Sequence, residues 1–375
     1  MGYSALKSNT ATGITAVGSG ALQSNTTGTN NAAVGYQALN VNSTGTDNTA
    51  VGYSALKNNT AIGNSAVGSS ALQSNTSGSR NAAVGYKALN VNTSGSYNTA
   101  MGSTVLQYNT GGYNTAIGYG AMQVNNTGSN NVAVGFSALS TTTTANNNTA
   151  IGSAALSYNV GGANNTAIGS AALNSNISGI NNTAIGYDTD WAKAAGDNCT
   201  AIGYNASTGG NSNYVQIGNT SVASIGGQVG WTARSDKRVK RNIQENVPGL
   251  DFILKLKPIS YTFNLEAQDS ITGAKADTSA VGRKGRLQAE AVVHTGFAAQ
   301  DVEKVLNTLG YDFDGLVKPQ NATDLYSLGY SNFTVPLVKA VQEQQLTIQA
   351  QQKQIETQQQ QIDELRKRLD KLSSP

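Results

Sequence analysis

The sequence predicts a mainly β protein, in which a parallel β-roll or solenoid of short repeats precedes a small α+β domain with a terminal coiled-coil helix. Three observations predict this fold class. A glycine after Ala-Val or Ala-Ile recurs at a nearly fixed spacing, the composition changes abruptly at residue 235, and isoleucines recur every seven residues near the C-terminus. We therefore expect repeats over 1–218, a glycine-rich linker over 219–234, an α+β domain over 235–334 and a coiled coil over 335–375.

The repeat unit reads approximately Asn-Asn-Thr-Ala-Ile-Gly-Tyr-x-Ala-Leu-x-x-Asn-x-x-Gly-x, and most copies are 17 residues long. Such a unit is too short and too interrupted by glycine for a stable helix, so it predicts a short strand, a turn and a second short strand. The aligned glycines are Gly18, Gly35, Gly52, Gly68, Gly85, Gly102, Gly118, Gly135, Gly152, Gly169, Gly186 and Gly203.

One repeat cannot bury its apolar face alone, so identical repeats are expected to stack. We expect the residue before the glycine and the leucine after it, such as Ile151 and Leu156, to fill the interior. Stacking also lets each asparagine form a hydrogen bond with the matching asparagine above and below. Residues 1–50 closely resemble residues 51–100, which indicates a duplicated block of three repeats.

Composition excludes several classes of protein. The net charges of residues 1–234 and 235–375 are +2 and +1, which make up the total of +3, so a strongly basic nucleic-acid-binding surface is not expected. No apolar run reaches the eighteen or so residues of a membrane helix, and the N-terminus lacks the pattern of a signal peptide. Neither a cofactor motif nor a metal-ligand cluster is predicted.

Several residues of the array are candidates for a function. Tyr36, Tyr53, Tyr86 and Tyr119 follow the repeat glycine, where they serve packing or contact a receptor or glycan; packing is the simpler interpretation. Cys199 occupies a repeat position and is expected to be a small packed residue rather than a reactive thiol.

The aspartates near the end of the array offer a second candidate. Asp188 and Asp190, close to Trp191 in the sequence, are a conceivable pair of the carboxylates that a glycosidase would need. Aspartates at such spacing on a loop more often solvate a turn. An active glycosidase is therefore the less favoured interpretation of this pair.

The Ala-Ile-Gly-x-x-Ala pattern resembles the head repeats of trimeric autotransporter adhesins. The resemblance implies a left-handed parallel β-roll that forms trimers. The present units are longer than the 14 or 15 residues typical of that family, so the extra Asn, Thr and Gly residues are expected in longer loops on one face.

The region after the array carries a second resemblance. Ser235–Ile243 resembles the opening of the C-terminal intramolecular chaperone domain of endosialidase-type phage tailspikes, which is also found in tail fibres. Three further motifs follow in the family's order, at Gly249–Phe263, Thr295–Glu303 and Val335–Glu343. Four motifs in the right order make this resemblance more specific than any one of them.

This resemblance implies a self-cleavage site. In the family a serine–lysine dyad cuts the chain just before the serine, which here implies Ser235 as nucleophile, Lys240 as general base and Arg234–Ser235 as the scissile bond. The chemistry is sound, because a lysine can serve as base when nearby cations and burial destabilise its ammonium form. The alternative is an inert chaperone-like domain in which the basic run is a solvated turn.

The expected elements of this domain follow from local patterns. Residues 249–257 are predicted to be helical, 259–263 to form a strand, 268–290 to form an exposed loop or hairpin, and 297–309 to form a helix that ends at Gly310. A histidine-based triad is not expected, because the single histidine, His294, has the neighbours of a structural strand residue.

The final stretch predicts a coiled coil. Isoleucine at these positions does not by itself specify three strands, so the expectation of a trimer rests on the two resemblances. The a positions are Val341, Ile348, Ile355, Ile362 and Leu369, and the d positions are Gln344, Gln351, Gln358, Leu365 and Leu372.

Together these features predict a homotrimeric tail-fibre or surface-fibre protein, on a virion or at a cell surface, whose C-terminal domain drives assembly and is then released by autocleavage. Its expected partners are two further copies of itself and a host-cell receptor or surface glycan. A bacterial trimeric adhesin is the alternative, and a glycan-depolymerising tailspike is a less favoured one. The only enzymatic activity considered is a single cut by the Ser235–Lys240 dyad in its own chain.

Overall fold

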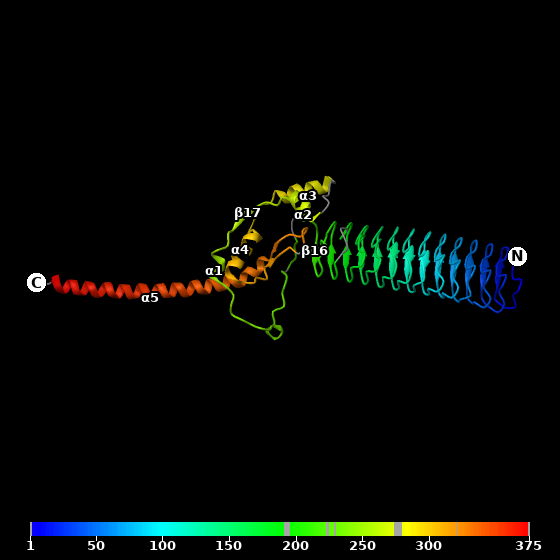
Figure 1. Cartoon of the computed structure of the whole chain (residues 1–375), viewed down its shortest axis with the longest axis horizontal. Helices are drawn as coiled ribbons and strands as arrows, with labels where there is room; N and C mark the ends of the chain where they lie inside the picture. Colours follow the sequence, from blue (N-terminus) through cyan, green and yellow to red (C-terminus); the bar gives the residue numbers. More distant parts are fainter. Residues whose placement is uncertain are drawn as a thin grey trace. The chain divides into compact units, whose positions relative to one another are not determined.

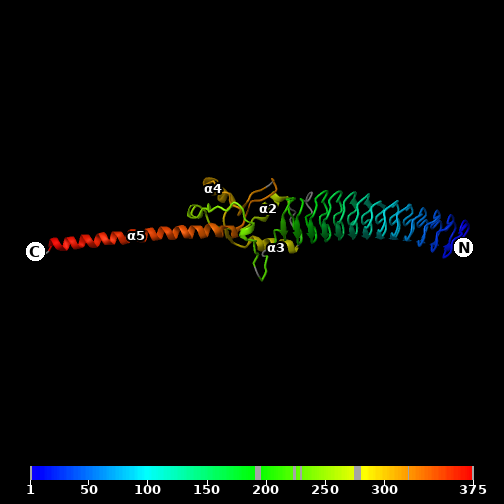
Figure 2. The same ribbon diagram turned by 90° about the horizontal axis from the view of Figure 1, so that it is seen from below.

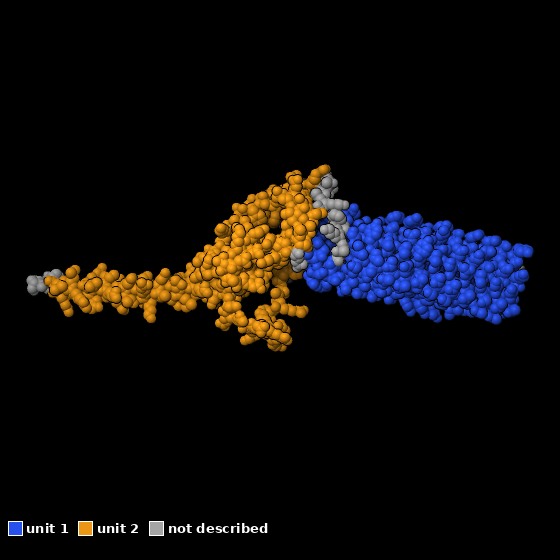
Figure 3. Space-filling view, viewed as in Figure 1, with its two compact units in different colours: residues 1–221 blue, residues 222–375 orange. Residues whose placement is uncertain are grey.

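The computed structural model describes residues 2–190, 196–222, 225–228, 230–273, 280–319 and 321–373. The chain forms two compact units, residues 1–221 and residues 222–375 (Figure 3).

The first unit is a parallel β-solenoid of about 12 turns, each of which is called a rung below (Figures 1 and 2). Its main sheet has 13 strands in sequence order, and matching residues of successive repeats lie side by side in it, as Ala150 pairs with Ala167. The strands are β1 (Thr15–Val17), β2 (Ala32–Val34), β3 (Thr49–Val51), β4 (Ser65–Val67), β5 (Ala82–Val84), β6 (Thr99–Met101), β8 (Thr115–Ile117), β10 (Val132–Val134), β12 (Thr149–Ile151), β13 (Thr166–Ile168), β14 (Thr183–Ile185), β15 (Thr200–Ile202) and β16 (Val215–Ile217).

The predicted second strand of each repeat is present in only three rungs of the described chain. There β7 (Tyr108–Asn109), β9 (Val124–Asn125) and β11 (Thr141–Thr142) form a parallel sheet of their own. In the remaining described rungs, turns occupy the corresponding positions. Backbone hydrogen bonds between rungs continue through these turns, as from Leu156 N to Ala172 O at 3.0 Å, so the stack does not require a second strand.

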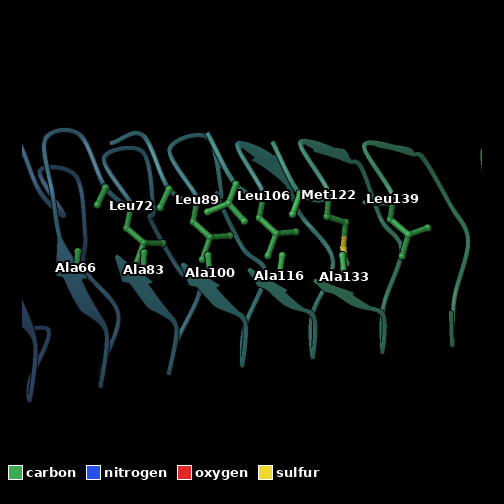
Figure 4. Packing of buried hydrophobic residues seen from close by; sticks show 14 of the residues in the cluster. Ala66, Leu72, Ala83, Leu89, Ala100, Leu106, Ala116, Met122, Ala133 and Leu139 are labelled. Carbon is green, nitrogen blue, oxygen red and sulfur yellow. The ribbon is translucent and has the colours of Figure 1, made fainter. Parts of the chain in front are cut away.

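The solenoid core differs from the prediction in one respect. Leu156 is fully buried as expected, but Ile151 is 40% exposed, and the alanine before it, Ala150, fills the interior instead. Alternate strand residues face opposite sides, so only one of the two can point inward. Figure 4 shows the reason: leucines or a methionine from one wall reach almost to the opposite strand, where only the alanine methyl group fits.

Buried asparagines form the predicted ladders between rungs. In one ladder Asn42 Nδ2 donates to Asn25 Oδ1 at 2.9 Å, and it also donates to Gly45 O at 3.0 Å. In a second ladder the side-chain oxygen accepts from the backbone of the next rung, as from Asn165 N to Asn148 Oδ1 at 2.9 Å. Most buried amide groups therefore have hydrogen-bond partners along the stack, the exceptions in the described rungs being Asn125 Oδ1 and Asn182 Nδ2, and these bonds hold each rung to its neighbours.

The glycine that ends each main strand is required by close backbone contact. Gly152 has a φ of +138°, and a Cβ there would overlap the carbonyl group of Gly169 in the next rung. Side chains at such φ values are strained. The recurring glycine thus lets two rungs approach at strand spacing.

The second unit holds short elements and one long helix. Its two small sheets, β17 with β18 and β19 with β20, are antiparallel. The elements are η1 (Lys237–Val239), α1 (Leu250–Ile253), β17 (Ile259–Tyr261), α2 (Leu265–Thr272), α3 (Ala280–Glu290), β18 (His294–Gly296), α4 (Ala299–Leu309), β19 (Leu316–Val317), β20 (Ser327–Leu328), η2 (Tyr330–Phe333) and α5 (Thr334–Ser373). Its core contains Phe252, Val302, Leu306, Phe313 and Phe333.

Two predictions for this unit were wrong. The helix predicted over 249–257 is the single turn of α1, because the chain must leave helical conformation ahead of Pro258. The predicted loop over 268–290 instead contains most of α2 and all of α3, whose polar composition suits two exposed helices joined by an ion pair of 2.6 Å between Asp269 and Arg286. Residues 274–279 of that stretch lie outside the described residues.

Three other predictions for this unit are confirmed: the end of α4, the structural place of His294 in a strand, and the terminal helix. Helix α4 ends at Gly310, which adopts a left-handed φ of +61°. His294 lies in strand β18, against the rings of Tyr261 and Phe263. The C-terminal helix α5 spans 40 residues, and its apolar a positions are exposed on the single chain. No helix in the described ranges is long and apolar enough to cross a membrane.

A Gly152→Ala substitution is expected to lower the melting temperature of the solenoid. The new methyl group would overlap the Gly169 carbonyl and impose roughly 1–3 kcal/mol of backbone strain. Gly161→Ala is the matched control, because a Cβ there would meet no atom within 4 Å; its effect should stay within about 0.5 kcal/mol. Thermal unfolding followed by circular dichroism compares the two, and equal melting temperatures would contradict the proposed role of the close contact.

Candidate functional site

The candidate site lies in the turn around η1, where the chain folds back on itself. Asp236 precedes this short helix and caps it, since its carboxylate accepts from Arg238 N at 2.9 Å. Lys240 N then donates to Lys237 O at 3.1 Å, which closes the turn. The two ends of the turn are therefore held close together.

The turn brings the two predicted catalytic residues into contact. Lys240 Nζ donates to Ser235 Oγ at 2.8 Å, although five residues separate the two along the chain. Arg234, Ser235 and Lys240 are all exposed on the single chain. The side chain of Ser235 is thus next to a basic nitrogen, and the preceding peptide bond is open to solvent.

Arg238 and Asp236 form an ion pair within the turn, and Lys240 takes no part in it. The guanidinium of Arg238 donates to both carboxylate oxygens of Asp236 and holds the pKa of Asp236 below its ordinary value. In return, Asp236 raises the pKa of Arg238. Asp236 therefore forms its ion pair with Arg238, while the Lys240 amine contacts the hydroxyl group of Ser235.

Sequence reasoning missed the part played by Asp236. The signal was present, because aspartate is among the preferred residues at the start of a helical turn, where its side chain accepts a backbone N–H bond. Of the cations expected around Lys240, Arg238 is neutralised by its partner, while Lys237 and Arg241 are exposed. The local positive charge thus comes from Lys237 and Arg241.

The structure does not bring the aspartates of the array together as an open catalytic pair. Asp190 is buried in the column that holds leucine in other rungs, and its carboxylate accepts from Thr208 N at 2.9 Å and from Thr208 Oγ1. Asp188 is half-buried and has partners of its own. Trp191 lies outside the described residues. Asp190 therefore closes the end of the apolar core and is not positioned for hydrolysis.

The structure also shows what surrounds Cys199 and the candidate tyrosines. Cys199 is buried, replaces an asparagine of the ladder, and donates from Sγ to Asn211 O at 2.8 Å, so the prediction of a small packed residue is confirmed. Burial raises the pKa of its thiol.

Tyr36 and Tyr53 are exposed and stack on each other with ring centroids 5.3 Å apart. In the ranges that the structure describes, no group of three His, Cys, Asp or Glu side chains could hold a metal ion.

A comparison with protein families finds a match over part of the second unit. The family model described as chaperone of endosialidase matches residues 235–311, so the match begins at Ser235. It does not include Val335–Glu343, the fourth motif on which the resemblance was based. No curated protein and no solved structure matches the chain.

Asp190→Asn is expected to stabilise the solenoid more at neutral pH than at acid pH. Burial is the largest influence on Asp190 and raises its pKa, so ionising this carboxyl costs the folded state free energy at pH values above its ordinary pKa. Asparagine keeps an acceptor for Thr208 N without a charge. The difference in melting temperature between variant and wild type should be more favourable to the variant at about pH 7 than at about pH 3.5. A pH-independent difference would contradict this account.

Proposed function

We propose that this protein is a homotrimeric tail-fibre or surface-fibre protein, whose C-terminal region assembles the trimer and is then released by cleavage between Arg234 and Ser235. A chaperone-of-endosialidase region behind a β-solenoid shaft fits a phage tail fibre or tailspike type protein. The observation that carries the cleavage proposal is the contact of 2.8 Å between Ser235 Oγ and Lys240 Nζ.

An exposed row of apolar side chains supports assembly of the shaft. The last residue of most main-sheet strands points away from the core, and these residues stack in register along the solenoid. A second copy can contact the row rung by rung, because its own row has the same spacing. This row, the apolar ladder, comprises Val17, Val34, Val51, Val67, Val84, Met101, Ile117, Ile151, Ile168, Ile185 and Ile202.

The C-terminal helix has a second unpartnered apolar seam. Ile348, Ile355 and Ile362 lie seven residues apart on α5 and are exposed on the single chain. A helix of 40 residues with such a seam gains stability by packing against copies of itself. The family match implies trimer assembly, and both exposed rows are suited to it.

Assembly that starts at the C-terminus would help the shaft to fold in the correct register. Nearly identical rungs can pair in the wrong register, and stacked parallel strands expose edges to aggregation while they form. A trimeric coiled coil would align three chains first, so that the solenoids form in matching register. Removal of the aligning region afterwards leaves a shaft that is kinetically trapped in its folded state.

The cleavage chemistry needs only residues of the turn and water. As the neutral amine, Lys240 accepts the Ser235 hydroxyl proton, and Oγ attacks the carbonyl carbon of Arg234. The peptide C–N bond breaks as lysine returns the proton to the Ser235 amine, which leaves an ester between Arg234 and Oγ. Water hydrolyses this ester to a carboxylate on Arg234 and the free hydroxyl of Ser235.

The fibre role implies a location and a partner. The protein would work outside the host cell, on a virion or at a cell surface, where the shaft meets a host-cell receptor or surface glycan. Exposed aromatic side chains on the shaft, such as Tyr53 and Tyr119, are suited to such contacts.

Wild-type protein is expected to be recovered as fragments of residues 1–234 and 235–375, whereas Ser235→Ala and Lys240→Ala stay at full length. The first substitution removes the nucleophile, and the second removes its base, which contacts it at 2.8 Å. Intact mass spectrometry measures the products. Lys257→Ala, an exposed lysine outside this turn, is the control and should still be cut. A wild type that is trimeric, folded and uncut would overturn the cleavage proposal.

Replacing Ile355 and Ile362 together by asparagine is expected to prevent trimer formation. Both residues belong to the exposed apolar seam of α5, and polar groups there remove the hydrophobic contact between helices. Size-exclusion chromatography with light scattering, on a Ser235→Ala background, gives the oligomeric state. Lys353→Ala lies outside the a and d positions and should leave the trimer intact. Trimers of the double variant would contradict assembly through α5.

A further inference from the structure

One exposed corner of the solenoid is a column of left-handed residues, one for each rung. The member of each rung precedes the main strand by two residues, and its backbone N–H donates to the rung before it, as from Tyr97 N to Ser79 O. We call this the corner column. Its members are Gly13, Asn30, Asp47, Gly63, Arg80, Tyr97, Tyr113, Asn130, Asn147, Asn164, Asn181, Asn198 and Asn213.

Three consecutive members depart from the rest. All the others are Asn, Asp or Gly, the residues that tolerate left-handed backbone, whereas Arg80, Tyr97 and Tyr113 have φ values of +56°, +61° and +58°. Bulky side chains are disfavoured in this conformation by on the order of 1 kcal/mol each. The core leucines, such as Leu39, adopt the same conformation but are fully buried, so packing offsets the cost there. Arg80, Tyr97 and Tyr113 are exposed, so the cost at these three adjacent rungs points to a role that the surrounding asparagines do not supply.

The duplication within the array gives an internal comparison. Residues 1–50 and 51–100 are closely similar, and the counterparts of Arg80 and Tyr97 in the first block are Asn30 and Asp47. Most other differences between the blocks exchange similar residues, such as Ser for Thr. The fold therefore accepts short polar residues at these two positions, and the larger ones are not required for the solenoid.

The three side chains form one cluster on the surface. The rings of Tyr97 and Tyr113 stack with centroids 4.8 Å apart and planes within 5°. The guanidinium carbon of Arg80 lies 5.4 Å from the Tyr97 ring centroid, and Nη1 donates to Tyr97 Oη at 2.6 Å. Arg80 is the only arginine before residue 234. The array thus concentrates a fixed, preorganised cation beside two stacked rings.

The cluster is accessible and separate from the apolar ladder. All three residues are exposed, with Tyr113 61% accessible. Arg80 lies at the corner before strand β5, whereas Val84 of the apolar ladder is the last residue of that strand. Contacts between copies along the ladder would therefore leave the corner column open.

We propose that Arg80, Tyr97 and Tyr113 bind an anionic polysaccharide. A guanidinium has five N–H donors, and its bond to Tyr97 leaves most of them for a carboxylate or phosphate group on a sugar. The tyrosine rings offer apolar faces and edges against the C–H groups of a pyranose ring. Asn130 and Asn147 continue the column, so their amides can meet the hydroxyl groups of the following sugars.

This proposal names a ligand class for the proposed fibre role, but it depends on neither the dyad nor cleavage. Binding can therefore be measured on the uncut Ser235→Ala protein as well as on the wild type. The probe is a glycan array that carries uronate-, sialate- and phosphodiester-containing oligosaccharides, each beside a neutral counterpart. We expect the wild-type protein to bind at least one anionic glycan on the array, called the retained glycan below. It should bind the neutral counterpart of that glycan at least about tenfold more weakly.

Arg80→Asn, Tyr97→Asn and Tyr113→Asn test the three residues. Asparagine occupies the same column in other rungs, so each variant should keep or raise the melting temperature while its affinity for the retained glycan falls by roughly tenfold or more. Lys57→Asn and Tyr158→Asn, substitutions elsewhere on the array, are the matched controls and should bind as the wild type does. The proposal is overturned if no anionic glycan is retained, if neutral counterparts bind equally, or if the three variants bind unchanged.

Discussion

Stacking of rungs at strand spacing is the constraint on which the first unit depends. Backbone hydrogen bonds between matching residues bring each glycine against the carbonyl of the next, as Gly152 lies against Gly169, and leave no room for a side chain. The interior of the solenoid is so narrow that one leucine and small alanines fill most rungs. Buried amides then find partners in their own rung and in neighbouring rungs, so the same repeat satisfies packing, sterics and hydrogen bonding together.

The narrow interior also decides what the protein presents outside. Because Ala150 occupies the inner position of its strand, Ile151 is directed outward, and the same exchange repeats along the array. A stack without room for its larger aliphatic residues must expose them or cover them with another surface. Folding of one chain and association of several copies are therefore connected by the same packing limit.

The junction depends on short-range interactions instead. Asp236 caps η1 and pairs with Arg238, so the contacts that shape the turn are local ones, and Lys240 is brought back to Ser235. In the corner column of the shaft, the identity of the side chain is likewise independent of the rest of the fold. There, side chains can change from rung to rung because the backbone conformation is maintained by the stack, which is why Arg80 and Tyr97 can replace asparagine and aspartate.

The sequence by itself determined the repeat period, the solenoid, the asparagine ladders, helix α4 and the terminal helix, because each of these repeats or ends by local rules. Ser235 and Lys240 were singled out only through the resemblance of their motif to the chaperone family. Only the tertiary structure decided that Ala150 rather than Ile151 fills the core, since period alone does not give the width of the coil. The helices α2 and α3 were likewise missed, because an ion pair between distant residues, Asp269 and Arg286, joins two segments whose composition is that of a loop.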